Sequence, residues 1–204
     1  MSQLEYLVAL ISIIVGLGLT DLAQSVRELI RPGYAVKWDG LPLAWSAFVF
    51  LFTILLWWNG FSVLESASSA GEAGPRFLSY LLFFFLLYLC CAFALPDPDW
   101  ETSVAGSGDG SEPAVDLEAF YFSAGHRRWF FGLLTGLFVA LGVDNQISFA
   151  WGSMQDRLVS ALAIGGLATA SAVPMVTDQR WAHWTAVAMT LGLIGWQAAR
   201  RILF

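Results

Sequence analysis

The sequence has little charge and no excess of basic residues. Of its 204 residues, 13% are charged, whereas about 25% is usual for a soluble globular domain. Lys and Arg number 10 against 16 Asp and Glu, which gives a formal net charge of −6. A nucleic-acid-binding protein typically carries a basic patch. This charge balance excludes that class, and we expect no nucleic-acid partner.

Cysteine and histidine are also scarce, with two of each. Cys90 and Cys91 are adjacent in an apolar run, where neighbouring thiols rarely bridge and no further metal ligand is at hand. His126 and His183 lie at the ends of predicted spans, which excludes a buried bis-histidine haem site. The motifs HExxH, GxSxG, GxGxxG and the P-loop are absent. We therefore expect no metal, no cofactor and no enzyme activity.

Apolar residues are in excess, at 57%, with a mean hydropathy of +0.65. A soluble domain of this size cannot bury so much apolar surface, so the composition indicates a membrane protein. A transmembrane helix needs about 20 mostly apolar residues. The sequence predicts one all-α domain, residues 1–204, built as a polytopic bundle in contact with the lipid bilayer. Its predicted spans are six, at about 4–22, 41–64, 77–95, 129–150, 158–176 and 181–202.

One polar loop, Asp97–Glu118, separates the third and fourth predicted spans and holds seven of the 16 acidic residues. We regard it as the candidate contact for a partner protein. Basic residues are more numerous on the loop side of the membrane than on the side of the termini, six against four. The positive-inside rule then places the loop in the cytoplasm and both termini outside.

Two short segments of the sequence resemble each other, which suggests an internal repeat. Gly16–Asp21 in the first span and Ala140–Asp144 in the fourth both read small-Leu-Gly-aliphatic-Asp when one gap is allowed. Because each segment opens a group of three spans, the match predicts a weak 3+3 inverted repeat, as in many transporters. Short apolar matches also arise by accident, and the rest of the two halves does not visibly align.

Polar residues within predicted spans are the first candidates for function, because hydrocarbon makes them costly. Asp21 and Asp144 each follow a long apolar run, and Asn59 follows Trp57 and Trp58 inside the second span. We interpret these five residues as lining an ion or solute path. Two alternatives stay open. The carboxylates could lie at the membrane edge, and the indoles could pack against neighbouring helices with their N–H groups bonded there.

Small residues at helical spacing predict close contacts between helices. They are Ser12, Gly16 and Thr20 in the first span, Gly132, Gly136 and Ala140 in the fourth, and Gly165 and Gly166 in the fifth. The fifth span is rich in small residues throughout, and a helix that thin is either wrapped by others or lies at a subunit axis. It therefore predicts a central, pore-lining or subunit-contact helix, and we expect a homo-oligomer.

Basic and aromatic residues mark the predicted membrane surfaces. His126, Arg127 and Arg128 stand at the entry to the fourth span, where we interpret them as an anchor that touches lipid phosphates or another anion. Trp45 and His183 fall near other predicted boundaries and are interpreted as members of an interfacial aromatic belt.

A further pattern is spread over the chain. It consists of Glu5 with Ser12–Gly18, Trp57–Trp58, Leu95–Asp97, Asp116–Phe122 and Arg127–Phe131. Together these segments resemble a family of small bacterial integral membrane proteins of about this length, and the likeness covers nearly the whole chain. The resemblance implies a multi-pass, inner-membrane location and an ordered, amphipathic end to the acidic loop. It transfers no catalytic role.

Two functions of different classes follow from the sequence. The first is an ion, proton or small-solute channel or transporter, in which carboxylates at membrane depth face a polar path. The alternative is a non-transporting scaffold or sensor that acts through a partner protein at the acidic loop. An intramembrane enzyme or a lipid-headgroup binder at His126–Arg128 is a third, less favoured candidate, because no paired catalytic groups are visible.

Overall fold

The computed structural model describes residues 3–31, 35–69, 73–96, 114–148 and 154–203. Within these residues the chain forms seven α-helices and one pair of three-residue strands, so the predicted all-α class is confirmed. The elements in chain order are α1 (Gln3–Ile30), β1 (Ala35–Lys37), α2 (Gly40–Ser69), α3 (Ala73–Phe93), β2 (Ala114–Asp116), α4 (Leu117–Phe122), α5 (Ala124–Ser148), α6 (Met154–Val176) and α7 (Arg180–Leu203).

Five of these helices are long and apolar enough to cross a membrane. Their apolar segments are Glu5–Ile30, Gly40–Gly60, Arg76–Phe93, Ala124–Ile147 and Arg157–Val176. The sixth predicted span, 181–202, does form a helix, α7, but α7 is not one of the five. His183, Gln197 and the arginines near its end make it more polar than the others. The described residues thus include five helices that fit an integral membrane protein, and the sixth predicted span is not confirmed.

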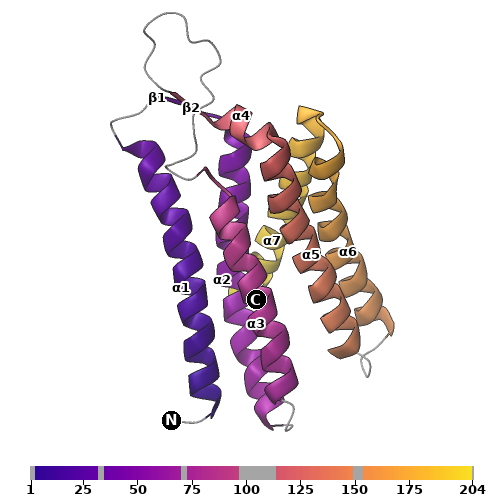
Figure 1. Ribbon diagram of the computed structural model, residues 1–204. Helices are drawn as coiled ribbons and strands as arrows, with labels where there is room; N and C mark the ends of the chain where they lie inside the picture. The colour runs from indigo at the N-terminus through magenta and orange to yellow at the C-terminus, as the bar shows by residue number, and fades with distance from the viewer. Residues whose placement is uncertain (1–2, 32–34, 70–72, 97–113, 149–153, 204) are drawn as a thin grey trace, which may run out of the picture.

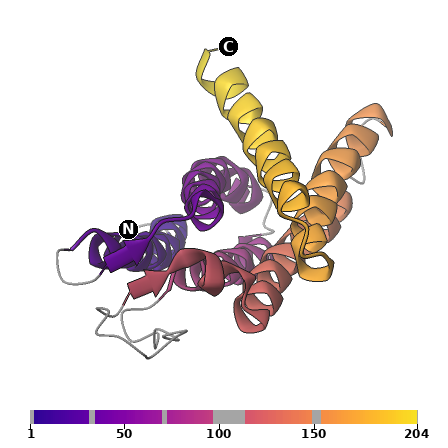
Figure 2. The same cartoon turned by 90° about the horizontal axis from the view of Figure 1, so that it is seen from above.

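The long helices alternate in direction along the chain (Figure 1). The strands β1 and β2 and the short helix α4 lie together at one end, which we call the strand end. The chain begins at the opposite end, which we call the N-terminal end. Seen along the bundle, α7 leaves the other helices obliquely (Figure 2).

The two halves of the chain pack differently. In the first half, α1 lies against both α2 and α3. In the second half, α6 lies against α5 and α7, and among the described residues α5 and α7 do not form a comparable contact. Helix packing therefore does not reproduce the symmetry that an inverted 3+3 repeat would give.

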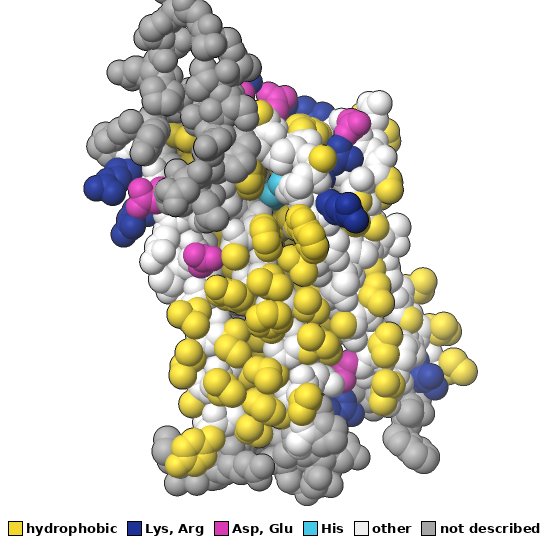
Figure 3. Space-filling model, viewed as in Figure 1, with side chains coloured by type: hydrophobic (Ala, Val, Ile, Leu, Met, Phe, Trp, Pro, Cys, Tyr) yellow, Lys and Arg dark blue, Asp and Glu magenta, His cyan; other side chains and the backbone are white. Residues whose placement is uncertain are grey.

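The outer surface of the bundle is apolar. Hydrophobic side chains cover the middle of the face in Figure 3, and charged side chains gather toward its ends. In the most apolar 18-residue stretch of α1 only 17% of the residues are buried, and in that of α2 39% are buried. Large side chains such as Ile13, Leu82 and Leu162 point outward. A surface of this kind is unfavourable in water and suits contact with lipid.

The interior near the strand end is a cluster of aromatic rings. Trp45 on α2 packs edge-on against Phe48 and against Phe131 on α5, with ring centroids 5.5 and 5.1 Å apart. Farther from the strand end, Phe52 on α2 meets Phe138 on α5 at 5.3 Å. Edge-to-face aromatic pairs are favourable beyond the area they bury. This aromatic cluster joins α2 to α5 in the half of the bundle nearer the strand end.

The strand end is organised around Asp116. β1 and β2 pair in parallel, with Lys37 opposite Asp116. Oδ1 of Asp116 accepts hydrogen bonds from the backbone N–H groups of Glu118 and Ala119, and so caps α4, while Oδ2 accepts from Nζ of Lys37 at 2.9 Å. The predicted acidic loop therefore ends earlier than expected, because its last residues form β2 and the start of α4. An ordered segment at this position is what the family resemblance implies.

The predicted stripes of small residues are only partly at helix contacts. Ser12 and Ala140 do meet other helices, through a hydrogen bond to Trp57 and through the core respectively. Thr20 is exposed, and Gly132 comes near the end of the Met175 side chain. Within the described residues, a side chain at Gly16, Gly136, Gly165 or Gly166 would meet nothing within 4 Å. The closest approaches occur instead at Gly60 against Tyr80, Gly142 against Ile164 and Gly40 against Trp184.

Removal of the Asp116 carboxylate should destabilise the strand end in a pH-dependent way. The Lys37 ammonium, together with the capped N–H groups, lowers the pKa of Asp116. A lowered pKa in the folded state means that the stabilisation is present above the unfolded-state value of about 3.9 and is lost as pH falls through the folded-state pKa. We expect Asp116→Ala to cost about 1 kcal/mol at pH 7, and to cost less at pH 2, where more of the folded molecules carry a protonated Asp116.

Chemical unfolding in detergent micelles at the two pH values measures this effect. Lys37→Met is the control, and it should cost less than Asp116→Ala because exposed ion pairs contribute little. A cost of Asp116→Ala that is the same at both pH values would contradict the assignment.

Candidate functional site

A cavity of about 530 Å³ lies between α2 and α3 on one side and α5, α6 and α7 on the other. Most of its wall is apolar, with Phe52, Leu141 and Leu167 among the lining residues. Its polar lining residues are Asn59, Arg76, Tyr80, Asp144, Asn145, Ser160 and Gln197. The volume falls within the range of small-molecule sites, about 300–1,000 Å³. An apolar cavity with a few convergent polar groups is the usual form of such a site.

The polar groups gather at one end of the cavity. Arg76 lies in the first turn of α3, and Asp144 lies four residues before the end of α5, so both are near the N-terminal end of the bundle. Phe52 and Phe138 lie about halfway along their helices. From Phe52 to Val63, both on the cavity wall, α2 rises about 16 Å. The cavity thus extends from the N-terminal end to about the middle of the bundle.

The aromatic cluster closes the cavity toward the strand end. Phe52 and Phe138 form its inner limit, and Phe48 stacks on Phe52 at 5.9 Å on the far side. Beyond them, Trp45 and Tyr121 are fully buried. The described residues therefore leave the cavity blind at this end.

A chain of hydrogen bonds crosses the closed end. The indole N–H of Trp45 on α2 donates to the hydroxyl oxygen of Tyr121 on α4 at 3.0 Å. The Tyr121 oxygen lies 2.7 Å from Nδ1 of His183 on α7, and Nε2 of His183 lies 2.8 Å from the carbonyl oxygen of Thr177. These contacts link α2, α4, α7 and the turn before α7.

The direction of the chain follows from the acceptors. A carbonyl oxygen can only accept, so Nε2 of His183 carries a proton and, in the neutral ring, Nδ1 is an acceptor. The Tyr121 hydroxyl then donates to Nδ1 while it accepts from Trp45. Burial raises the pKa of Tyr121, which keeps the hydroxyl protonated and able to donate. Each of the three buried polar groups therefore has a partner.

Ion pairs reinforce the same end from outside. Asp39 is buried, and its Oδ1 accepts from the backbone N–H of Leu41 at the start of α2. Its Oδ2 pairs with Arg180 at the start of α7, and Arg180 also reaches Glu118 on α4 at 2.7 Å. Pairing and hydrogen bonding are what make a buried carboxylate tolerable. α2, α4 and α7 are thus tied together at the strand end.

The polar end of the cavity bridges the two groups of helices. The carboxylate of Asp144 on α5 lies 3.6 Å from the guanidinium of Arg76 on α3. Both side chains are partly exposed, 22% for Asp144 and 20% for Arg76. Beside them, the amide of Asn145 donates to the hydroxyl of Ser160 on α6. A ligand here would meet a cation, an anion and neutral amides within one small region.

Two of the five predicted path residues line this cavity, and three do not. Asn59 and Asp144 are on its wall, whereas Asp21, Trp57 and Trp58 are not. Asp21 is part-exposed on α1. Trp58 is 69% exposed, so its side chain faces outward from the bundle. For Trp57, the alternative that the indole bonds a neighbouring helix holds, because its N–H donates to Ser12 on α1 at 3.1 Å.

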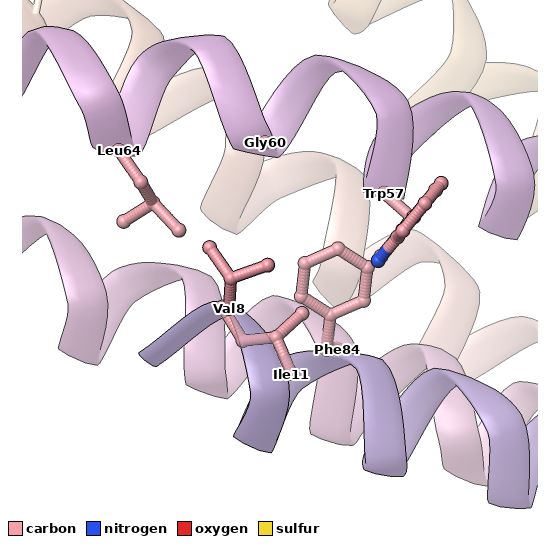
Figure 4. A pocket seen from close by; sticks show the side chains of 6 residues that line it. All are labelled: Val8, Ile11, Trp57, Gly60, Leu64 and Phe84. Carbon is pink, nitrogen blue, oxygen red and sulfur yellow. The ribbon is translucent and has the colours of Figure 1, made fainter. Parts of the chain in front are cut away.

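Trp57 instead borders a second, much smaller hollow between α1, α2 and α3 (Figure 4). The residues that line this hollow are Val8 and Ile11 of α1, Trp57, Gly60 and Leu64 of α2, and Phe84 of α3. Its volume of about 10 Å³ is near the minimum for one water molecule. This hollow is too small to hold a solute.

Two of the three residues of the predicted anchor at the start of α5 make contacts inside the bundle. His126 is buried, with its ring stacked on Phe130 at 5.2 Å. Arg127 donates to the carbonyl oxygens of Pro174 and Met175 and pairs with Asp178. It therefore supplies hydrogen-bond donors to carbonyl groups in the last turn of α6, which lack partners within the helix. Arg128 alone is exposed and keeps the predicted role of lipid or anion contact as an expectation.

Two residues assigned to the aromatic belt are also internal. Trp45 is 1% exposed and His183 is fully buried, because the hydrogen-bond chain with Tyr121 holds both at the closed end of the cavity. An interfacial belt residue would instead present its ring to the lipid headgroups.

In the part of the chain that the structure describes, no three His, Cys, Asp or Glu side chains are grouped as a metal site would require. Residues 97–113 of the predicted acidic loop lie outside the described residues. The partner-protein contact predicted there stays a prediction.

No family model, no curated protein and no solved structure matches this chain. The family resemblance therefore stays an expectation, and the cavity with its residues is the basis for assigning a function.

We expect Tyr121→Phe to loosen the closed end. Loss of the hydroxyl leaves the buried Trp45 N–H and Nδ1 of His183 without a partner, which should cost about 1–3 kcal/mol of stability. Unfolding in detergent measures this cost. Tyr6→Phe is the control, because Tyr6 is 61% exposed, and it should change nothing. Equal stability of the two variants would mean that the hydrogen-bond chain contributes nothing.

The cavity should admit reagents from one side only. Ser160 lines the cavity, whereas Ser171 lies on the same helix about 16 Å nearer the strand end and is fully buried. We expect Ser160→Cys to react with a membrane-impermeant maleimide added from the N-terminal side, and Ser171→Cys to stay unreactive. The wild type is the blank, because Cys90 and Cys91 are buried. Equal labelling at both positions would contradict a blind cavity.

Proposed function

We propose that the protein is a membrane carrier for a small solute, which binds in the cavity between α2–α3 and α5–α7. The observation that carries the proposal is the form of the cavity. It is of solute size, has a polar wall at the N-terminal end and is closed by packed aromatic rings toward the strand end.

A carrier fits this form better than a channel does. A channel needs a continuous polar path across the membrane, whereas the cavity ends at Phe52 and Phe138. A cavity open to one side is the form that a carrier takes in one of its two states. In the other state the aromatic cluster would part and the N-terminal end would close.

The contacts between the two helix groups support such a movement. At the strand end, α2 and α7 are tied by Asp39 and Arg180 and by the hydrogen bonds through Tyr121. At the N-terminal end of the cavity, the ion pair of Arg76 with Asp144 links α3 to α5. A ligand that competes for this pair would change the balance between the two states, since a ligand shifts an equilibrium by its differential affinity.

The proposal includes the finer membrane assignments. α7 would serve as a sixth, oblique span beside the five apolar helices. The location would be the bacterial inner membrane, with the strand end in the cytoplasm. A homo-oligomer is part of the proposal because the small residues Gly16, Gly136 and Gly165 face outward, where a second copy could approach closely. The inverted repeat stays a prediction that helix packing does not support.

Flux through reconstituted liposomes tests the carrier function. Ala163 lines the cavity, whereas Ala161, on the same helix, is exposed in a shallow apolar groove between α5 and α6. We expect the wild type to transport at least one solute from a panel of inorganic ions, amino acids and sugars. Ala163→Trp should fill the cavity and reduce that flux at least tenfold, and Ala161→Trp should leave it unchanged.

Two outcomes would overturn the carrier function. One is the absence of protein-dependent flux for every solute of the panel. The other is a flux that Ala163→Trp leaves at the wild-type rate, because the transported solute would then not pass through the cavity.

A further inference from the structure

The charged residues on the cavity wall balance one another. Of the lining residues that the structure describes, Arg76 carries the positive charge and Asp144 the negative charge. We propose that the cavity binds a zwitterion with an apolar body, whose ammonium group faces Asp144 and whose carboxylate or phosphate faces Arg76. This inference rests on the proposed function, since it names the class of solute.

The geometry of the ion pair leaves it accessible to a ligand. The shortest distance between its charged atoms is 3.6 Å, which is longer than a charge-assisted hydrogen bond of about 2.7–2.9 Å. Each side chain keeps about a fifth of its surface exposed. A guanidinium has five N–H donors and a carboxylate has about four acceptor sites. Opposite ends of a zwitterion can therefore bond the two residues side by side.

The charge balance argues against a ligand with a net charge. In a cavity with apolar walls, an uncompensated charge carries a large desolvation cost. An anion on Arg76 would offer no compensating charge to Asp144 beside it, and a cation on Asp144 would offer none to Arg76. A zwitterion compensates both charges at once, so the site stays neutral when it is occupied.

The neutral polar residues suit the same ligand. Asn59, Asn145 and Gln197 lie on the cavity wall and carry side-chain amides, each with both donor and acceptor atoms. They can bond an ammonium through the amide oxygen and a carboxylate through the amide nitrogen. They favour neither sign of charge, in contrast to the wall of a cation or anion path, where rings of one sign are usual.

The apolar wall deep in the cavity indicates that the ligand has an apolar group. The ion pair lies near the N-terminal end of the bundle, and the wall beyond it runs to Phe52, Phe138 and Leu167. A ligand with its charged groups at the ion pair would extend an apolar group toward these rings. This burial is favourable by about 25 cal/mol per Å² of apolar surface.

Two sources offer this chemistry. One is a free amino acid with an apolar side chain. The other is a zwitterionic lipid headgroup with an ammonium and a phosphate, such as that of phosphatidylethanolamine, whose acyl chains would occupy the apolar part.

Equilibrium binding to the purified full-length protein in neutral detergent tests the proposal with leucine and two analogues. Leucinamide lacks the carboxylate and N-acetyl-leucine lacks the ammonium, so each keeps the apolar side chain and one charge. We expect leucine to bind, and both analogues to bind at least about tenfold more weakly, because each can bond only one member of the ion pair.

Variants of the ion pair should reverse this preference. With Asp144→Asn the site keeps only the positive charge and should prefer N-acetyl-leucine, whereas with Arg76→Gln it should prefer leucinamide. A reversed preference can only come from folded protein, so misfolding cannot imitate it. Asp21→Asn and Arg157→Gln are the controls, because neither residue lines the cavity, and both should keep the wild-type preference.

A second arm covers the lipid source. The protein is purified from vesicles that contain equal amounts of phosphatidylethanolamine and anionic phosphatidylglycerol, and the retained lipid is quantified. Enrichment of phosphatidylethanolamine that is lost with Asp144→Asn, without leucine binding, supports the zwitterion and assigns it to a lipid. Preference of the wild type for a singly charged probe, or no preference in either arm, overturns the proposal.

The outcomes separate this inference from the carrier function. Leucine or phosphatidylethanolamine binding without any flux would overturn the carrier and leave the zwitterion site standing. Flux of an inorganic ion that Ala163→Trp blocks, without zwitterion binding, would leave the carrier standing and overturn the inference.

Discussion

The structure depends on how it satisfies polar groups that cannot stay in an apolar medium alone. The hydroxyl of Tyr121 is the clearest case, because it accepts from Trp45 and lies within bonding distance of His183, and all three side chains are buried. An unpaired buried polar group costs about 1–3 kcal/mol, so these partners fix where α2, α4 and α7 meet. The aromatic cluster can pack tightly only because this hydrogen-bond chain leaves no polar atom of the three unpaired.

The same constraint sorts polar groups to the two ends of the bundle, where they have different effects. At the strand end, Asp39 is buried and bonded to both Arg180 and the backbone of α2, which ties α2 to α7 there. At the N-terminal end, Arg76 and Asp144 are partly exposed to a cavity, and their contact is longer. The two ends of this interface therefore differ in how readily a ligand in the cavity can reach their charged groups.

The spans were predictable from the sequence because apolar composition over about 20 residues acts locally. The same argument located Asn59 and Asp144, since a polar residue in an apolar run stands out. What it could not provide was the direction in which a side chain points. Trp57 and Trp58 are neighbours, yet one bonds α1 and the other faces outward. His183 and His126 lie near helix ends, as residues of an interfacial belt do. In the fold, aromatic side chains of α4 cover both rings, and no local sequence pattern predicts that α4 packs there. The sequence did not predict Arg76 as a residue of the site, because its partner Asp144 lies on another helix.

Near the first turns of α7, Arg180 meets Asp39 and Trp184 lies against Gly40, and from there the helix runs obliquely to the others. A rotation of such a helix about its first turns would move its far end most. Over 24 residues it is about 36 Å long, so a rotation of about 10° there displaces the far end by about 6 Å. A small change in the way the Trp184 ring lies against Gly40 would therefore produce a large displacement of the helix beside the cavity residue Gln197.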